Sequence, residues 1–288
     1  MKHILVALDL TPASEWAFER ARQVAEAHGV GLTAVHVIDD QVLTYDGDNG
    51  NFGAVLAARA EARLSRLWSD LPASLASRFR HVISTGSPWQ GIVAAAEESD
   101  ASLIVLGLHR VNPMLDVFIG TTAERIIRHA AAPVLMVRDK PAGAYRKVMV
   151  GTDFSPSSSH ALQAALRLVP AADFLVVHIF ETPFPGLIRL TDDQLEAYRK
   201  ERHAEAANQV QADLGMFLGT YTGPKAPRIT SLCERGEPVH GLARMVERHQ
   251  PELLVIGTDS RNSLPGARLG SVAVTFLNDP PCDVLVSH

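Results

Sequence analysis

Two aspartates each follow a short apolar run and precede a residue that carries a hydroxyl group. Asp9 is followed by Thr11, and Asp153 is followed by Ser155. A carboxylate at the end of a buried strand can accept a hydrogen bond from the ribose hydroxyl of a nucleotide. It can equally accept hydrogen bonds from the turn that follows it. Both aspartates are therefore candidate ligand-binding residues, with a purely structural turn as the alternative.

Glycines and hydroxyl residues form a second set of candidates. Gly120 and Thr121, like Gly270 and Ser271, stand immediately before an apolar pattern of helical period. The first amides of a helix, its partial positive charge and a neighbouring hydroxyl together make an anion site. A glycine-assisted, hydroxyl-capped helix start is the alternative.

Two further glycines, Gly107 and Gly257, each end an apolar run that reads as a strand. A glycine at such a position lets a ligand contact the backbone directly. Both are therefore added to the candidate binding residues.

The motifs that would make these candidates catalytic are missing from the sequence. The twelve histidines form no HExxH motif and no cluster with metal-ligand spacing. There is no GxSxG elbow, no Walker lysine motif and no GxGxxG after a strand. His36 and His178 are expected to be hydrogen-bonded structural residues. We therefore predict a binding protein that is not an enzyme and has no metal site of its own.

Composition narrows the class of protein further. Hydrophobic residues make up 47% of the 288 residues and charged residues 20%, which is typical of a soluble globular protein. The net charge of −5 gives no attraction to nucleic-acid phosphates or anionic lipid, and no segment reads as a signal peptide or membrane span. Two cysteines outside any CxxC pair indicate a reducing compartment. We predict a cytoplasmic protein that binds neither nucleic acid nor membrane.

The candidates occur twice because the chain repeats itself. The segment 6–12, which contains Asp9, aligns with the segment 150–156, and the register continues to the end of both halves. Such a repeat predicts two similar domains. We assign residues 1–138 to the first domain, 139–144 to a linker and 145–288 to the second domain.

Within each half, short β-rich apolar runs alternate with longer helical segments, which predicts an α/β fold whose parallel sheet is covered on both faces. The leucines and the tryptophan of the helix 52–70 are interpreted as core packing. A long helix is expected to begin near Thr191, at a capping box. The expected strands are 3–9, 31–38, 79–84, 102–107, 134–137, 146–153, 173–180, 228–233, 252–257 and 283–287; the other expected helices are 12–28, 88–98 and 119–130.

The order of the strands decides whether the candidates meet. In a doubly wound five-stranded sheet of order 3-2-1-4-5, ligands bind between the carboxyl ends of the first and fourth strands. This order would bring Asp9 close to Gly107 and Asp153 close to Gly257. We predict two tandem domains of this kind.

Two spacings give the chain a specific resemblance. The pattern Asp-x-[Ser/Thr]-x-x-Ser begins at Asp9 and again at Asp153. Gly107 and Gly257 are each followed by three residues, then by nine more, and then by Gly-Thr or Gly-Ser. Together these patterns resemble the universal stress protein family, whose nucleotide-binding members carry Gly-x-x-Gly, nine residues, then Gly-Ser or Gly-Thr. The resemblance covers essentially the whole chain and implies a Rossmann-like fold related to the adenine nucleotide alpha hydrolases.

The resemblance also implies a ligand, ATP or AMP, with Mg²⁺ if the nucleotide is ATP. The adenine edge would be read by the backbone of Val37 or Ile179. The chain departs from the family at the second glycine, which is Arg110 in the first half and Ser260 in the second. Arg110 can offer a guanidinium to a phosphate or fill an empty pocket, and both readings stay open. The small Ser260 makes the second half the favoured nucleotide or anion site.

Three functions follow from these expectations. The leading one is a stress-response regulatory or binding module controlled by its ligand. The second is a scaffold in which both pockets have decayed, and the third is a weak nucleotide hydrolase. The resemblance further implies that 134–137 and 284–287 pair antiparallel as an intrachain pseudo-dimer, with a homodimer as a further possibility.

Overall fold

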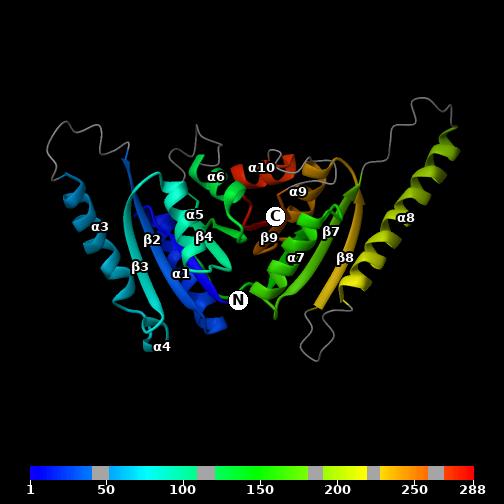
Figure 1. Cartoon of the computed structure of the whole chain (residues 1–288). Coiled ribbons are helices and arrows are strands. Elements are labelled where there is room, and N and C mark those ends of the chain that lie inside the picture. The colour runs from blue at the N-terminus through cyan, green and yellow to red at the C-terminus, as the bar shows by residue number, and fades with distance from the viewer. Residues whose placement is uncertain (41–51, 109–120, 181–190, 219–227, 259–268) are drawn as a thin grey trace. The chain divides into compact units, whose positions relative to one another are not determined.

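The computed structural model describes the chain outside residues 41–51, 109–120, 181–190, 219–227 and 259–268. It contains two compact units. One comprises Met1–Ala144 together with Phe276–Ser287, and the other comprises Tyr145–Thr275 together with His288. Figure 1 labels helices and strands of both units where there is room.

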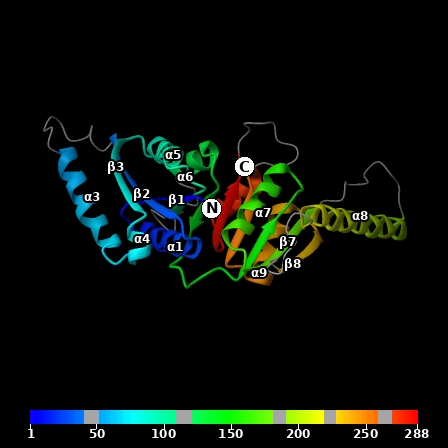
Figure 2. The same ribbon diagram turned by 60° about the horizontal axis from the view of Figure 1, so that its bottom comes forward.

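The first unit alternates strands and helices as the sequence predicts. Its sheet runs in the order β3-β2-β1-β4-β5, which is the expected order 3-2-1-4-5, and all of these neighbours are parallel. Figure 2 shows α5 and α6 on one side of this sheet and α1 and α4 on the other. The elements are β1 (His3–Ala7), α1 (Pro12–His28), β2 (Gly31–Asp39), α3 (Phe52–Trp68), α4 (Ala73–Ala76), β3 (Phe79–Gly86), α5 (Pro88–Glu98), β4 (Leu103–Gly107), α6 (Thr121–His129) and β5 (Val134–Val137).

The last strand of the chain, β10 (Asp283–Ser287), completes the first unit. It runs antiparallel to β5, as the resemblance implies, with Leu285 opposite Leu135. At its start, the carboxylate of Asp283 lies 3.4 Å from the guanidinium of Arg20 in α1, and both side chains are buried. The same carboxylate accepts a hydrogen bond from the backbone N–H of Arg138 at 2.8 Å.

The second unit repeats the arrangement. Its strands run in the order β9-β6-β7-β8, which corresponds to β4-β1-β2-β3 of the first unit, and its neighbours are parallel where their register is defined. The predicted α/β fold with doubly wound parallel strands is therefore confirmed. The elements are β6 (Lys147–Gly151), α7 (Pro156–Leu168), β7 (Asp173–Phe180), α8 (Asp192–Leu218), β8 (Arg228–Arg235), α9 (Pro238–His249), β9 (Leu253–Gly257) and α10 (Ser271–Asn278).

Helix starts are fixed by local chemistry. Thr11 caps α1 and Ser155 caps α7, and in each the side-chain oxygen accepts from the backbone N–H three residues later, at 3.4 and 3.2 Å. A proline follows each cap, at a position whose missing N–H has no helical partner. The capping box is also present, because Thr191 N–H donates to Gln194 at 3.0 Å while Gln194 N–H donates back at 3.4 Å.

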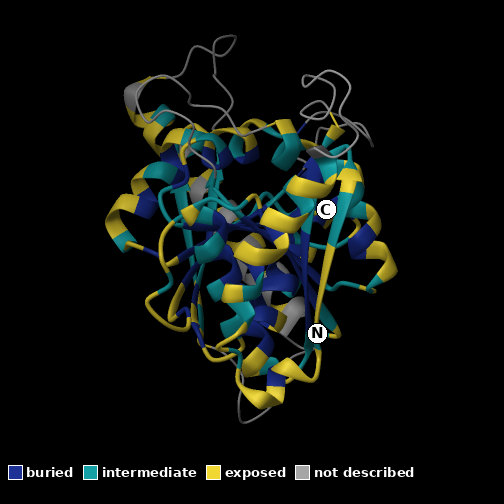
Figure 3. Cartoon of the chain, turned by 90° about the vertical axis from the view of Figure 1, so that its left-hand side faces the viewer, coloured by how far each residue is buried: buried dark blue, intermediate teal, exposed yellow. Residues whose placement is uncertain are grey.

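The central strands are buried on both faces, as their continuous apolar character predicts. Residues Ile4 to Val6 and Leu253 to Val255 are wholly buried, whereas the residues of β3 and β8 are half-buried or exposed. Figure 3 shows this concentration of buried residues on the strands and of exposed residues on the helices. No helix among the described residues is both long and apolar enough to cross a membrane.

Candidate functional site

The turns that carry the two aspartates have the same unusual backbone in both units. β1 ends at Ala7 and β6 at Gly151, so the expected strand ends at 9 and 153 were two residues too late. Leu10 and Phe154 adopt left-handed conformations with φ of 64° and 63°. Residues with a side chain rarely adopt this conformation, and where they do it often marks a functional site. The chain therefore leaves each strand through a constrained turn.

Both aspartates act as acceptors within these turns. Asp9 Oδ1 accepts from the backbone N–H of Thr11 at 3.0 Å and from its hydroxyl at 2.5 Å. Asp153 Oδ1 accepts from the backbone N–H of Ser155 at 3.0 Å. The structural alternative for these residues is thus realised, and each carboxylate is held in place at the end of its strand.

The paired histidines have the structural role that the sequence predicts. His36 Nδ1 lies 2.6 Å from the carbonyl oxygen of Leu8, and His178 Nδ1 lies 2.7 Å from that of Thr152. A carbonyl accepts only, so Nδ1 carries the proton in both rings. Each histidine therefore ties the second strand of its unit to the residue just before the aspartate.

The glycines that end β4 and β9 have a packing reason that sequence reasoning missed. A Cβ atom at Gly107 would lie 2.5 Å from the carbonyl oxygen of Ala13, and one at Gly257 would lie 2.8 Å from the backbone nitrogen of Ser158. Both glycines thus admit the first turn of a helix, α1 or α7, against the strand. Their presence does not require a ligand.

Two further glycines bring helices against the residues expected to read adenine. A Cβ atom at Gly91 in α5 would meet the side chain of Val37 at 2.9 Å, and one at Gly241 in α9 would meet that of Ile179 at 2.6 Å. The signal for them lies in the repeat, because each glycine stands three residues after a matching proline, Pro88 or Pro238.

The second unit gathers most of its candidates around one pocket of about 440 Å³. Asp153, Ile179, Gly257, Gly270 and Ser271 all line it, whereas Ser260 lies outside the described residues. The expected meeting of carboxylate and helix start at one pocket is therefore found in this unit.

The start of α10 differs in one detail from the expectation. The N–H of Gly270 donates to the carbonyl of Thr258 at 2.8 Å, so this amide is already used. The intrahelical ladder begins with Val274 N–H donating to Gly270 at 2.9 Å. The amides of Ser271, Val272 and Ala273 consequently have no intrahelical acceptor, and all three residues line the pocket.

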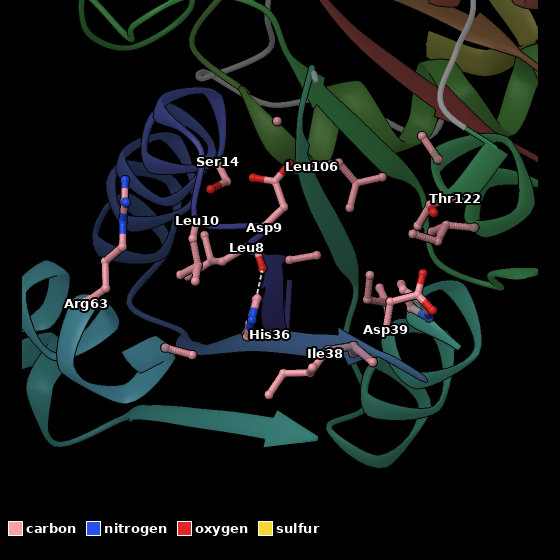
Figure 4. A pocket seen from close by; sticks show the side chains of 18 of the residues that line it. Leu8, Asp9, Leu10, Ser14, His36, Ile38, Asp39, Arg63, Leu106 and Thr122 are labelled. Carbon is pink, nitrogen blue, oxygen red and sulfur yellow. Dashed lines mark hydrogen bonds between the residues drawn. The ribbon is translucent and has the colours of Figure 1, made fainter. Parts of the chain in front are cut away.

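The first unit has a larger pocket, of about 650 Å³. Asp9, Val37 and Gly107 line it, and from α6 the lining residues are Thr122, Ala123 and Ile126, whereas Thr121 begins the helix. Arg110 and Gly120 lie outside the described residues. Figure 4 shows the labelled lining residues, including His36 with its hydrogen bond to Leu8.

Helix α3 contributes to this pocket in a way that the sequence did not reveal. Four of its residues line the pocket at helical spacing: Leu56, Arg59, Ala60 and Arg63. Positions i, i+3, i+4 and i+7 share one face of a helix. The helix was interpreted as core packing alone, and Leu64 is indeed fully buried, but the neighbouring face carries two arginines to the pocket.

Comparisons with known proteins agree with the fold. The model of a family described as the universal stress protein family matches residues 1–138 and again 144–288. A universal stress protein of Mycobacterium tuberculosis strain H37Rv is 24% identical over 309 residues, which covers 99% of this chain and 94% of the relative. Universal stress protein A homolog 1 of Coxiella burnetii is 32% identical over 141 residues, covering 47% of this chain and 95% of the relative.

Among solved structures, a universal stress protein from Archaeoglobus fulgidus superimposes with a TM-score of 0.67 at 17% sequence identity, covering 99% of this chain and 97% of the other. At this identity the likeness concerns the fold alone. It extends over both units of the chain.

Proposed function

This chain belongs to the universal stress protein family, and we propose that its second unit binds an adenine nucleotide, ATP or AMP, in order to regulate the protein's interactions. The observation that carries the proposal is the pocket of about 440 Å³ lined by Asp153, Ile179 and the first residues of α10. This volume falls within the range of small-molecule sites, about 300–1,000 Å³.

The lining residues suit the three parts of a nucleotide. The backbone of Ile179, near the end of β7, would face the adenine edge, and the carboxylate of Asp153 would accept from a ribose hydroxyl. The amides of residues 271–273 and the hydroxyl of Ser271 would hold the phosphates at the start of α10, where the helix carries partial positive charge.

A Mg²⁺ ion that accompanies ATP would be held mainly by the phosphates. The described part of the chain contains no group of three or more histidine, cysteine or acidic side chains placed to bind a metal. Mg²⁺ commonly binds through substrate phosphates and water with only one or two carboxylates. ATP-bound metal is thus compatible with a single nearby carboxylate such as Asp153.

A regulatory role fits this chemistry better than hydrolysis. Among the described lining residues, the groups that could act as a base are Asp153, which is held by its turn, and His178, whose Nδ1 is bound to Thr152. These hydrogen bonds position the loop, and no arginine or lysine among the described lining residues of this pocket could stabilise a phosphoryl group during transfer. Cys233 and Cys282 are not joined in a disulfide bond, which fits a reducing compartment such as the cytoplasm.

Calorimetric titration with AMP and ATP tests the proposal. Ser271→Asp places a negative charge at the expected phosphate position, and because an acidic residue suits the start of a helix, the variant should fold normally. Repulsion between charges about 5 Å apart should weaken AMP binding about tenfold or more. Thr121→Asp makes the matched change at the start of α6 and should leave the affinity unchanged. Equal losses in the two variants, or no binding by the unmodified protein, would contradict the proposal.

A further inference from the structure

The pocket of the first unit differs from that of the second in the residues around its aspartate. Leu8 occupies the position of Thr152, and Leu108 occupies the position of Thr258. In the second unit these threonines make hydrogen bonds, Thr152 with Ser158 at 3.0 Å and Thr258 with His288 at 3.0 Å. Leucine at both positions replaces hydroxyl groups by aliphatic surface.

Most of the remaining lining of this pocket is also aliphatic. Leucine, isoleucine, valine, methionine and alanine side chains come from the strands β1, β2, β4 and β5, from the segments that follow β1 and β4, and from the helices α3, α5 and α6. The larger members of this set are Leu8, Leu10, Val37, Ile38, Leu56, Ile92, Leu106, Leu108, Ile126 and Met136. Covering an apolar surface of this extent with the apolar body of a ligand lowers the free energy.

Four charged side chains line the same pocket, and three of them interact within the protein. Asp9 accepts a hydrogen bond from Thr11, and Arg63 forms an ion pair with Glu15 at 3.2 Å. Asp39 also interacts with another part of the protein. Arg59 is exposed and has no ion pair or hydrogen bond with any residue that the structure describes. The charge at this pocket that is not compensated by a described neighbour is therefore positive.

The positive charge lies on one side of the pocket. Arg59 lies one helical turn from Arg63 on the face of α3 that lines the pocket, so the two guanidiniums belong to the same side. In Figure 4, Arg63 and Asp39 lie on opposite sides of the labelled residues, with Asp9 between them. The apolar pocket of the first unit therefore has both of its arginines on the side formed by α3.

We infer that the first unit binds an amphipathic carboxylate, with its alkyl body among the aliphatic lining residues and its carboxylate on Arg59. A guanidinium forms strong, often bidentate hydrogen bonds with a carboxylate, and the alkyl body uses the surface that a free inorganic anion would leave uncovered. The pocket of about 650 Å³ is large enough for a medium-length chain. This inference concerns another unit and does not rest on the nucleotide proposal.

Decanoate, below its micelle-forming concentration, is the probe, and intrinsic fluorescence is the readout. All three tryptophans of the chain, at positions 16, 68 and 89, lie in the first unit, so a saturable change in their emission reports binding there. Calorimetry gives the dissociation constant in parallel. Arg59→Gln should weaken decanoate binding about five- to tenfold, and Leu108→Thr, which copies the second unit, should also weaken it.

Arg66→Gln is the matched control, since Arg66 is also exposed on α3 but is not among the described lining residues. It should leave decanoate binding unchanged. Decanol, which has the same body without the charge, should bind the unmodified protein and Arg59→Gln equally. No saturable binding of decanoate, or equal weakening by the two arginine variants, would overturn the inference.

The location of the probe separates this inference from the nucleotide proposal. Ser271→Asp, which is designed to reject AMP, should bind decanoate as the unmodified protein does. Loss of decanoate binding in that variant, or its displacement by AMP, would place the probe in the second unit and would also overturn the inference. A protein that binds decanoate but no nucleotide would support it while refuting the nucleotide proposal.

Discussion

Gly107→Ala distinguishes the two explanations for a glycine at the end of the fourth strand. If the glycine serves ligand contact, an added methyl group lowers ligand affinity and leaves stability alone. If it serves packing, the methyl group destabilises the protein without any ligand. The structure favours packing, because the new Cβ would lie 2.5 Å from the carbonyl oxygen and 2.6 Å from the carbonyl carbon of Ala13.

The size of the effect follows from these distances. The clashing atoms are backbone atoms of the first turn of α1, so they cannot rotate away as the end of a side chain can. Overpacking of this kind costs about 1–3 kcal/mol, and the reduced freedom of the unfolded chain returns about 0.4–1 kcal/mol. We expect a net loss of about 1–2 kcal/mol in the free energy of unfolding. With a typical dependence on urea, the midpoint should fall by about 0.5–1 M.

Tryptophan emission is the appropriate assay, because it follows the first unit selectively. The control is Gly215→Ala in α8, where nothing lies within 4 Å of the position that a Cβ would take. There the same substitution should stabilise the helix by about 0.5–1 kcal/mol, as circular dichroism can show. An unchanged midpoint for Gly107→Ala would refute the packing argument.

Three further substitutions test individual contacts. Arg20→Met removes the cation that faces the buried carboxylate of Asp283, the two side chains being 7% and 6% exposed, and should lower the free energy of unfolding in urea by about 3–5 kcal/mol. Arg22→Met, which breaks a more exposed ion pair, should lower it by less than about 1 kcal/mol. Equal losses in the two variants would contradict the argument. Burial lowers the pKa of His3 in the folded protein. The stability that the neutral ring contributes is therefore present above the unfolded pKa of about 6.5 and is lost as the pH falls through the folded pKa. The free energy of unfolding of His3→Gln should depend less on pH between about 5 and 7.5 than that of the unmodified protein. Ser155→Ala removes the cap of α7 and should lower the unfolding free energy by about 1 kcal/mol, measured by circular dichroism.

The fold could be predicted from the sequence because its signals are local and repeated. Proline after a hydroxyl cap fixed the starts of α1 and α7, and apolar runs without polar alternation identified the buried strands. The ends of β1 and β6 were misplaced for a physical reason. The predicted strands ran on to the aspartates because residue types do not show where strand pairing stops, and the left-handed conformations of Leu10 and Phe154 are not indicated by their residue types either.

The site was only partly predictable, because its residues belong to surfaces that the sequence does not assign to one another. Asp153 and Ser271 were found from their types and spacing, and both line the second pocket. Arg59 and Arg63 were missed because helical period shows which residues share a face but not what that face meets. The roles of Gly107 and Gly257 were also missed, since a close approach of two backbones is visible only in three dimensions.

The repeat itself separates structural residues from residues that choose a ligand. Both units keep the aspartate, the left-handed residue after it, the histidine that is hydrogen-bonded to the carbonyl just before the aspartate, and the glycine that contacts the first turn of helix α1 or α7. Each of these residues has a geometric reason within its own unit. Residues that differ between the units are free of that requirement. Leucine in place of threonine at 8 and 108, and arginines on α3, therefore alter the chemistry of the first pocket without altering the fold around it. Exchanging residues 8 and 108 for threonine should consequently change which ligand binds while the positions of β1 and β4 stay the same.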